Sequence, residues 1–267
     1  MNSRNLLLNA YVYLVLCFLV VPILIILPMA FSETDYITFP PRGFTWQWFG
    51  AFFQSAQWMS ATAFSARIAF FTAISSAVIG LCASYAIVRG KGALATVFQT
   101  LLIGPIVVPH IALAIALYLL FQSVGLTETT AGYVIAHTII ALPFSVFTIV
   151  AALSQVDPAL EDAAMCCGAN RFAAFRAVTL PLIWPNVLSG GLFAFVISFD
   201  EPVISFFLAG VRDKTLPRMM FDDIEQNLTP IIPAIAVMLT LLSIVVLVGA
   251  AGLRALAMRS QQTVSEE

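Results

Sequence analysis

Two adjacent carboxylates, Asp200 and Glu201, interrupt a long apolar stretch of the sequence and are followed at once by Pro202. A carboxylate inside a bilayer is costly, so such residues usually face a partner, a cavity or water. A proline removes a helix hydrogen bond, which suits a helix that breaks beside a cavity. The pair could therefore attract a cationic solute on its route. It could equally be solvated at a helix end or paired with a neighbouring subunit, and both interpretations stay open.

Two histidines also lie in apolar stretches. His110 follows Pro109, and His137 stands six residues into the next apolar stretch. Polar side chains often join membrane helices by hydrogen bonds, and we favour that interpretation for both. His110 is kept as a weaker candidate for a solute pathway.

The spacing of histidine, cysteine and carboxylate residues in this sequence does not indicate catalysis or metal binding. No pattern of histidine, cysteine and carboxylate spacing indicates a metal site, and we predict neither metal ligands nor catalytic residues. The four cysteines have no C-x-x-C spacing and are expected to be free thiols: Cys17, Cys82, Cys166 and Cys167. The sequence also lacks the G-x-x-x-x-G-K-[ST] pattern of a phosphate-binding loop, so we expect no ATP hydrolysis by this chain.

The composition predicts a lipid environment. Of the 267 residues, 61% are hydrophobic and 10% are charged, against about 25% charged residues in an ordinary soluble domain. The net charge of −2 gives no basic field for nucleic acid. A bilayer core needs about 20 mostly apolar residues in a helix. Six stretches qualify: Leu6 to Phe31, Ile68 to Val88, Ala93 to Phe121, Ala131 to Leu153, Val187 to Ala209 and Ile231 to Leu253.

These stretches predict an all-α integral membrane protein with about six transmembrane helices, organised as one domain over residues 1–267. The first stretch lacks a clear cleavage signature and is interpreted as a retained helix. With a cytoplasmic N-terminus, the inner segments hold seven of the twelve basic residues, a weak positive-inside bias that favours two cytoplasmic termini. Aromatic residues crowd the first outer segment, among them Trp46, Trp48 and Trp58, and are typical of a helix at the headgroup level.

The segment from Asp157 to Pro185 is too long and too patterned for a simple turn. Asp157 can cap a helix that Pro158 begins, and Glu161 and Asp162 then lie at the positive end of its dipole. Gly168 can end that helix, after which apolar residues recur at helical spacing as far as Leu180 and Pro181. We therefore predict two short helices joined at a glycine, lying across the cytoplasmic side.

This segment resembles the cytoplasmic loop of the permease subunits of bacterial ATP-binding-cassette importers of the type I, binding-protein-dependent kind. That loop reads Glu-Ala-Ala, three residues, Gly, nine residues, Ile, one residue, Leu-Pro. Here Asp162-Ala163-Ala164 is followed after three residues by Gly168, after nine more by Val178, and then by Thr179 and Leu180-Pro181. Asp162 replaces the usual Glu, although Glu161 precedes it, and Val178 replaces Ile. Both replacements keep the chemical type.

The resemblance implies that the loop is a coupling helix that inserts into a groove of an ATPase subunit. The residues expected to carry this role are Glu161, Asp162, Ala163, Ala164, Gly168, Leu180 and Pro181. In such a complex this chain would join a homologous second permease, two ATPase subunits with their ATP and magnesium, and a periplasmic or surface substrate-binding protein. The expected location is the bacterial inner (plasma) membrane. No cofactor is expected in this chain itself.

Softer features extend the resemblance over most of the chain and bring it nearest to the second permease of the spermidine/putrescine type. They are Gly104-Pro105 and Pro109, Ser198 to Glu201, and Leu216-Pro217 through Pro230. The resemblance implies a polyamine as the solute. An opine, an aminophosphonate or an amino acid derivative is the alternative within the same kind of importer. The alternative from another class is an ion-coupled secondary transporter or channel without an ATPase, but the paired repeats common in such folds are not evident.

Overall fold

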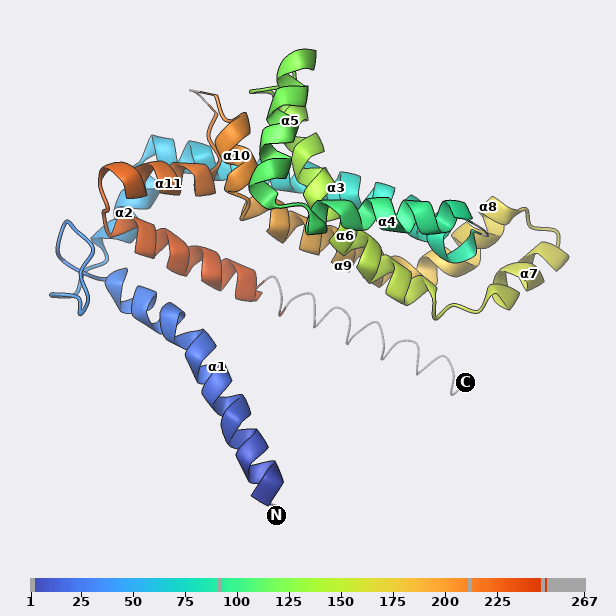
Figure 1. Cartoon of the computed structure of the whole chain (residues 1–267), viewed down its shortest axis with the longest axis horizontal. Coiled ribbons are helices and arrows are strands. Elements are labelled where there is room, and N and C mark those ends of the chain that lie inside the picture. Colours follow the sequence, from blue (N-terminus) through green and yellow to red (C-terminus); the bar gives the residue numbers. More distant parts are fainter. Residues whose placement is uncertain (1–2, 91–92, 211–212, 246–247, 249–267) are drawn as a thin grey trace. The chain divides into compact units, whose positions relative to one another are not determined.

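The computed structural model describes residues 3–90, 93–210, 213–245 and 248. Every regular element in these ranges is a helix, and most coincide with the apolar stretches of the sequence (Figure 1). In chain order they are α1 (Ser3–Met29), α2 (Gln47–Gln54), α3 (Ala56–Arg89), α4 (Ala93–Val107), α5 (His110–Val124), α6 (Thr130–Leu153), α7 (Pro158–Cys166), α8 (Arg171–Ala174), η1 (Phe175–Thr179), α9 (Leu180–Phe199), α10 (Val203–Leu208), α11 (Leu216–Gln226) and a last apolar helix, Ile231–Val245.

The chain divides into two compact units. Among the described residues, the first unit comprises 3–60 and 220–245, and the second comprises those within 61–219. In the first unit, the indole Nε1 of Trp48 donates to the carbonyl of Ser32 at 2.7 Å, and the ring of Phe31 stacks on that of Phe44 at 4.9 Å. The predicted aromatic outer segment is thus a folded element that contains the short helix α2.

Small residues bring three long helices of the second unit together. A Cβ atom added to Gly190 of α9 would lie 2.8 Å from Ser145 Oγ of α6, and one added to Gly80 of α3 would lie 2.9 Å from the same atom. The Ser145 hydroxyl donates to the carbonyl of Ser76 on α3 at 3.0 Å. Close backbone approach through small residues and hydroxyl groups is typical of membrane helix packing. The core therefore forms where α3, α6 and α9 meet.

Four described helices are long and apolar enough to cross a bilayer: Leu8–Met29, Ala56–Arg89, Thr130–Leu153 and Arg171–Phe199. The predicted span Ala93 to Phe121 is instead two helices, α4 and α5, which bend by 108° at Pro109. Proline has no N–H and disfavours a helical residue before it, which explains the break. Counted as one span, the pair gives five, and the shorter Ile231–Val245 follows. Of the sixth predicted span, residues 246, 247 and 249–253 lie outside the described residues.

The second half of the predicted loop differs from expectation. Arg171 to Phe199 is one helical span through α8, η1 and α9, so the residues from Phe172 to Pro181 begin a long helix and do not form a separate short one. The prediction was wrong because the helical spacing up to Pro181 continues into the apolar stretch, and Pro181 is accommodated within the span just after the π-helical turn η1. The predicted break after Phe199 is confirmed, since α9 ends there and α10 starts at Val203.

Candidate functional site

The helix α7 begins and ends as its sequence predicts. The Asp157 carboxylate accepts from the N–H of Ala159 at 2.9 Å, and Pro158 stands at the first helical position. Gly168 follows the helix with φ +94°, a left-handed conformation that glycine adopts readily. The Asn170 side chain then caps the next helix by accepting from Ala173 N–H at 2.8 Å. The helix is therefore bounded on both sides by local sequence signals.

One face of α7 is open to solvent. Asp162 and Ala163 are exposed, and the side chain of Leu160 is 46% exposed. Phe172, just beyond the Gly168 turn, is 72% exposed. All four cysteines are free, and two of them, Cys166 and Cys167, are exposed at the end of the helix. A short helix that presents alanines, one carboxylate and apolar side chains is suited to close docking against another protein.

Glu161 points the other way. It is buried, and the Thr179 hydroxyl donates to its Oε1 at 2.6 Å while the Tyr85 phenol donates to its Oε2 at 3.0 Å. Arg89 Nε lies 3.4 Å from Oε1 and completes an ion pair. Of the two carboxylates predicted to face an ATPase, the structure leaves Asp162 exposed and places Glu161 inside the chain.

Those contacts determine the protonation of Glu161. Burial by itself raises the pKa of a carboxyl group, but the hydrogen bonds from Thr179 and Tyr85 and the charge of Arg89 outweigh it. The pKa of Glu161 therefore lies below its ordinary value, and the side chain is a carboxylate at neutral pH. Leu180 and Pro181, the last residues of the motif, follow Thr179 directly and open α9.

A second group of predicted residues meets at the break between α9 and α10. The Glu201 Oε1 accepts from the N–H of Ile204 at 2.9 Å, and Oε2 lies 3.4 Å from His110 Nε2. Glu201 is 5% exposed, whereas the side chain of His110 is 45% exposed. Asp200 ends α9 with an exposed side chain. The structure thus joins Glu201 to His110 and leaves Asp200 the accessible member of the carboxylate pair.

His137 is fully buried beside this break and connects three helices. Its Nδ1 lies 3.1 Å from the carbonyl of Ser198 on α9, and its Nε2 lies 3.3 Å from the hydroxyl of Ser205 on α10. The Ser198 hydroxyl also lies 2.8 Å from Nδ1, and a hydroxyl can donate or accept, so the ring bonds to α9 and α10 in either tautomer. The predicted interhelical hydrogen bonding of His137 is confirmed.

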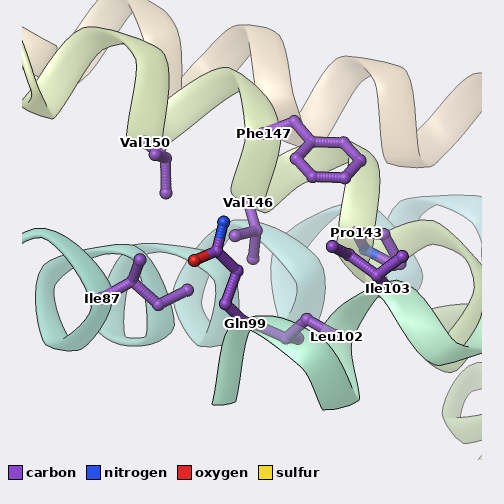
Figure 2. Close-up of a pocket in the computed structure, with 8 residues that line it drawn as sticks. All are labelled: Ile87, Gln99, Leu102, Ile103, Pro143, Val146, Phe147 and Val150. Atoms are coloured by element: carbon purple, nitrogen blue, oxygen red, sulfur yellow. The ribbon is translucent and has the colours of Figure 1, made fainter. Parts of the chain in front are cut away.

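A small pocket lies between α3, α4 and α6, with Gln99 the one polar side chain among the eight that line it (Figure 2). Its volume is about 30 Å³. The other seven residues are Ile87, Leu102, Ile103, Pro143, Val146, Phe147 and Val150. This space suits about one water molecule and not an organic solute, so the pocket is not a solute site.

Residues 76–259 match the family described as the binding-protein-dependent transport system inner membrane component. The chain belongs to this family. It is therefore a multi-pass inner membrane permease of an ATP-driven importer, and its family assigns ATP hydrolysis to a separate subunit. This membership excludes the ion-coupled secondary transporter as an interpretation.

The permease is similar to curated proteins over most of its length. It is 31% identical to the spermidine/putrescine transport system permease protein PotC of Haemophilus influenzae, over 92% of this chain and 95% of that protein. It is 30% identical to the putrescine transport system permease protein PotI of Escherichia coli, over 83% of this chain and 81% of that protein. The expected resemblance to spermidine/putrescine-type permeases is confirmed.

Solved structures support the fold. A chain of a bacterial importer of the acidic polysaccharide alginate matches with a TM-score of 0.71 at 15% identity, over 94% of this permease and 98% of that chain. A second structure of an alginate importer, in complex with an alginate-bound periplasmic protein, matches with a TM-score of 0.67 at 18% identity, over 93% of each chain. At these identities the match establishes the fold of a type I importer permease and not its solute.

Sequence reasoning missed the partners of Glu161. Tyr85 lies near the end of the second apolar stretch and Arg89 follows that stretch directly, whereas Thr179 stands in the motif between Val178 and Leu180. A basic residue at the end of an apolar stretch indicated an available cation. Nothing in the spacing indicated that this cation faces residue 161.

Proposed function

We propose that this permease forms half of the translocation pathway of a polyamine importer, together with a homologous second permease. The observation that carries the proposal is its identity of about 30% to PotC and PotI over more than four fifths of the chain. Their names specify spermidine and putrescine as solutes. Both termini are assigned to the cytoplasm, so α7 faces the ATPases and the break after α9 lies deeper along the pathway. An opine, aminophosphonate or amino acid derivative remains the alternative solute.

The accessible carboxylate supports a cationic solute. Glu201 is engaged by Ile204 N–H and His110, whereas the exposed Asp200 has a negative charge to offer at the same break. A polyamine has several ammonium groups, each of which a carboxylate can attract in surroundings less polar than bulk water. Asp200 is therefore assigned the direct role, and Glu201 and His110 hold the backbone around it.

The experiment is ATP-dependent uptake of labelled putrescine and spermidine into vesicles that contain the permease, its co-encoded subunits and the binding protein. We expect uptake by the wild type and a loss of uptake of about tenfold or more in Asp200→Asn. A lost attraction of about 1.4 kcal/mol between the carboxylate and the solute lowers affinity tenfold. Asp35→Asn, which removes an exposed carboxylate of the first unit, is the matched control and should transport normally. Wild-type vesicles that hydrolyse ATP but move neither amine would refute the polyamine assignment.

The exposed face of α7 is assigned to an ATPase, with two ATPase subunits in the complex, each binding ATP and magnesium. The support is the spacing of the motif from Asp162 to Pro181 together with the exposure of Asp162 and Ala163. Replacing Ala163 by Arg adds bulk on the solvent side without crowding the permease itself. Copurification of the ATPase should then be lost, while Ser154→Arg, in the exposed turn before α7, should retain it. Normal copurification of Ala163→Arg would contradict the assignment.

A further inference from the structure

The helix α7 is held to the rest of the permease by a carboxylate. Glu161 is the one buried residue of α7, whose nine residues are all described. Helices usually pack through an apolar stripe, which tolerates small shifts because dispersion contacts have little directionality. Hydrogen bonds depend steeply on distance and angle. The hydrogen bonds of one carboxylate therefore fix the position of α7 more strictly than its small contact area alone would.

The partners of Glu161 come from two different membrane helices. Tyr85 and Arg89 occupy the last turns of α3, and Thr179 precedes α9 within the continuous span Arg171–Phe199. Each contact reaches across at least eighteen residues of sequence, so none is a local feature of α7. The carboxylate is the point at which the coupling helix meets the ends of α3 and α9.

Two further contacts stiffen this connection. Arg89 also donates from its terminal guanidinium nitrogen to the carbonyl of Val156 at 2.9 Å, which fixes the link between α6 and α7. The ring of Tyr85 packs edge-on against that of Phe175 in η1, with centroids 5.0 Å apart. The same side chains that hold Glu161 thus also hold the segments before and after the coupling helix.

We propose that Glu161 is a positioning residue that fastens α7 to α3 and α9, so that a displacement of α7 moves the inner ends of both membrane helices. The inference rests on the proposed docking of an ATPase on α7 and reassigns Glu161 from that docking surface to the transmission behind it. Docking and transmission are then carried by neighbouring residues on opposite faces, Asp162 outside and Glu161 inside. Loss of Glu161 should uncouple ATP hydrolysis from uptake while the ATPase stays bound.

The test uses the complete importer in lipid nanodiscs and vesicles, and three variants. Glu161→Leu keeps the approximate volume and removes every acceptor. Thr179→Val and Tyr85→Phe each remove one hydroxyl donor and little else. Asp157→Asn is the matched control, because it removes a carboxylate from the same helix while asparagine remains a good cap. Thr179→Ser is the conservative variant that retains the hydroxyl.

Two readouts separate transmission from mere folding. Hydrogen exchange of the amides of α7 should accelerate at least tenfold in Glu161→Leu and a few-fold in Thr179→Val and Tyr85→Phe. The number of ATP molecules hydrolysed per solute imported should rise several-fold in Glu161→Leu and about twofold in the two hydroxyl variants, with the ATPase still bound. Asp157→Asn and Thr179→Ser should match the wild type in both measurements.

An unchanged ratio of hydrolysis to uptake in all three variants would overturn the proposal, even if exchange of α7 accelerates. Should Glu161→Leu fail to assemble, Thr179→Val and Tyr85→Phe decide the matter, and wild-type behaviour of both overturns it. Exchange of α7 requires neither solute nor ATP. A wild-type importer that moves no polyamine would therefore refute the proposed solute while leaving the fastening of α7 measurable.

Discussion

Two buried glutamates of this permease hold very different groups together. Glu161 receives side-chain donors from α3 and from the residue before α9, and none of its three contacts is within its own helix. Glu201 accepts from the backbone of Ile204, three residues further along the chain, and has His110 as its contact on another helix. The first is a junction between elements, and the second is mainly a local cap at a break.

The difference shows how one residue type serves two tasks in a membrane protein. At α7, the charge of Glu161 is offset by an arginine and two hydroxyl groups, so it can join helices without an apolar interface. At the break between α9 and α10, the freed backbone N–H needs an acceptor, which Glu201 supplies. Its neighbour Asp200 then stays exposed. Three predictions test whether these two regions are as distinct as their contacts indicate.

The largest expected effect comes from disturbing the packing of α9, the helix that lies between the two regions. Gly190→Ala places a Cβ atom 2.8 Å from Ser145 Oγ and 3.2 Å from the backbone of the same residue, where α6 and α9 pack. Overpacking of this kind costs about 1 to 3 kcal/mol of folding stability. Thermal unfolding of the purified permease in detergent should shift to lower temperature.

Gly104→Ala is the matched control, because an added Cβ there meets nothing within 4 Å. It should leave the midpoint unchanged or raise it, since alanine favours a helix over glycine by up to about 1 kcal/mol. Equal midpoints for Gly190→Ala and the wild type would show that α6 and α9 can separate without cost, and the close packing at Ser145 would lose its assigned importance.

A smaller effect distinguishes the two glutamates directly. Glu161→Gln removes the charge that faces the largely buried Arg89, and a hydrogen bond to a charged group is worth roughly 1 kcal/mol more than a neutral one. Glu201→Gln keeps a carbonyl oxygen for Ile204 N–H and offers an amide donor to His110. Hydrogen exchange should therefore accelerate in α7 for the first variant and stay near wild type in α10 for the second. The reverse result would mean that the charge matters at the break and not at the junction.

Much of this architecture was predictable because its signals are local. The membrane helices follow from the length of their apolar stretches, and α7 follows from Asp157 with Pro158 at its start and Gly168 after its end. The break at Asp200 to Pro202 follows from charge and proline within an apolar stretch. In each case neighbouring residues determine the backbone, so the sequence contains the necessary information.

The remaining features depend on contacts distant in sequence. The bend at Pro109 was missed because prolines such as Pro105 and Pro143 are tolerated inside α4 and α6, so proline alone does not distinguish a kinked helix from a broken one. The inward orientation of Glu161 was missed because residues 161 and 162 both have carboxylate side chains. Contacts from residues distant in sequence distinguish them: Tyr85, Arg89 and Thr179 all face Glu161.

The smallest predicted effect is a pH dependence confined to the junction. The folded pKa of Glu161 is lowered from its ordinary value of 4.5, so the folded chain binds its proton less readily than the unfolded chain does. The contribution of the carboxylate is therefore complete above about pH 4.5 and is lost as pH falls through the lower, folded pKa. Protection of the α7 amides, corrected for intrinsic exchange, should decline over that acidic range in the wild type. In Glu161→Gln, which cannot titrate, the decline should be weaker, so the two proteins should converge at low pH. A constant difference between them down to pH values well below 4.5 would show that the shape of the side chain, and not its charge, holds α7 in place.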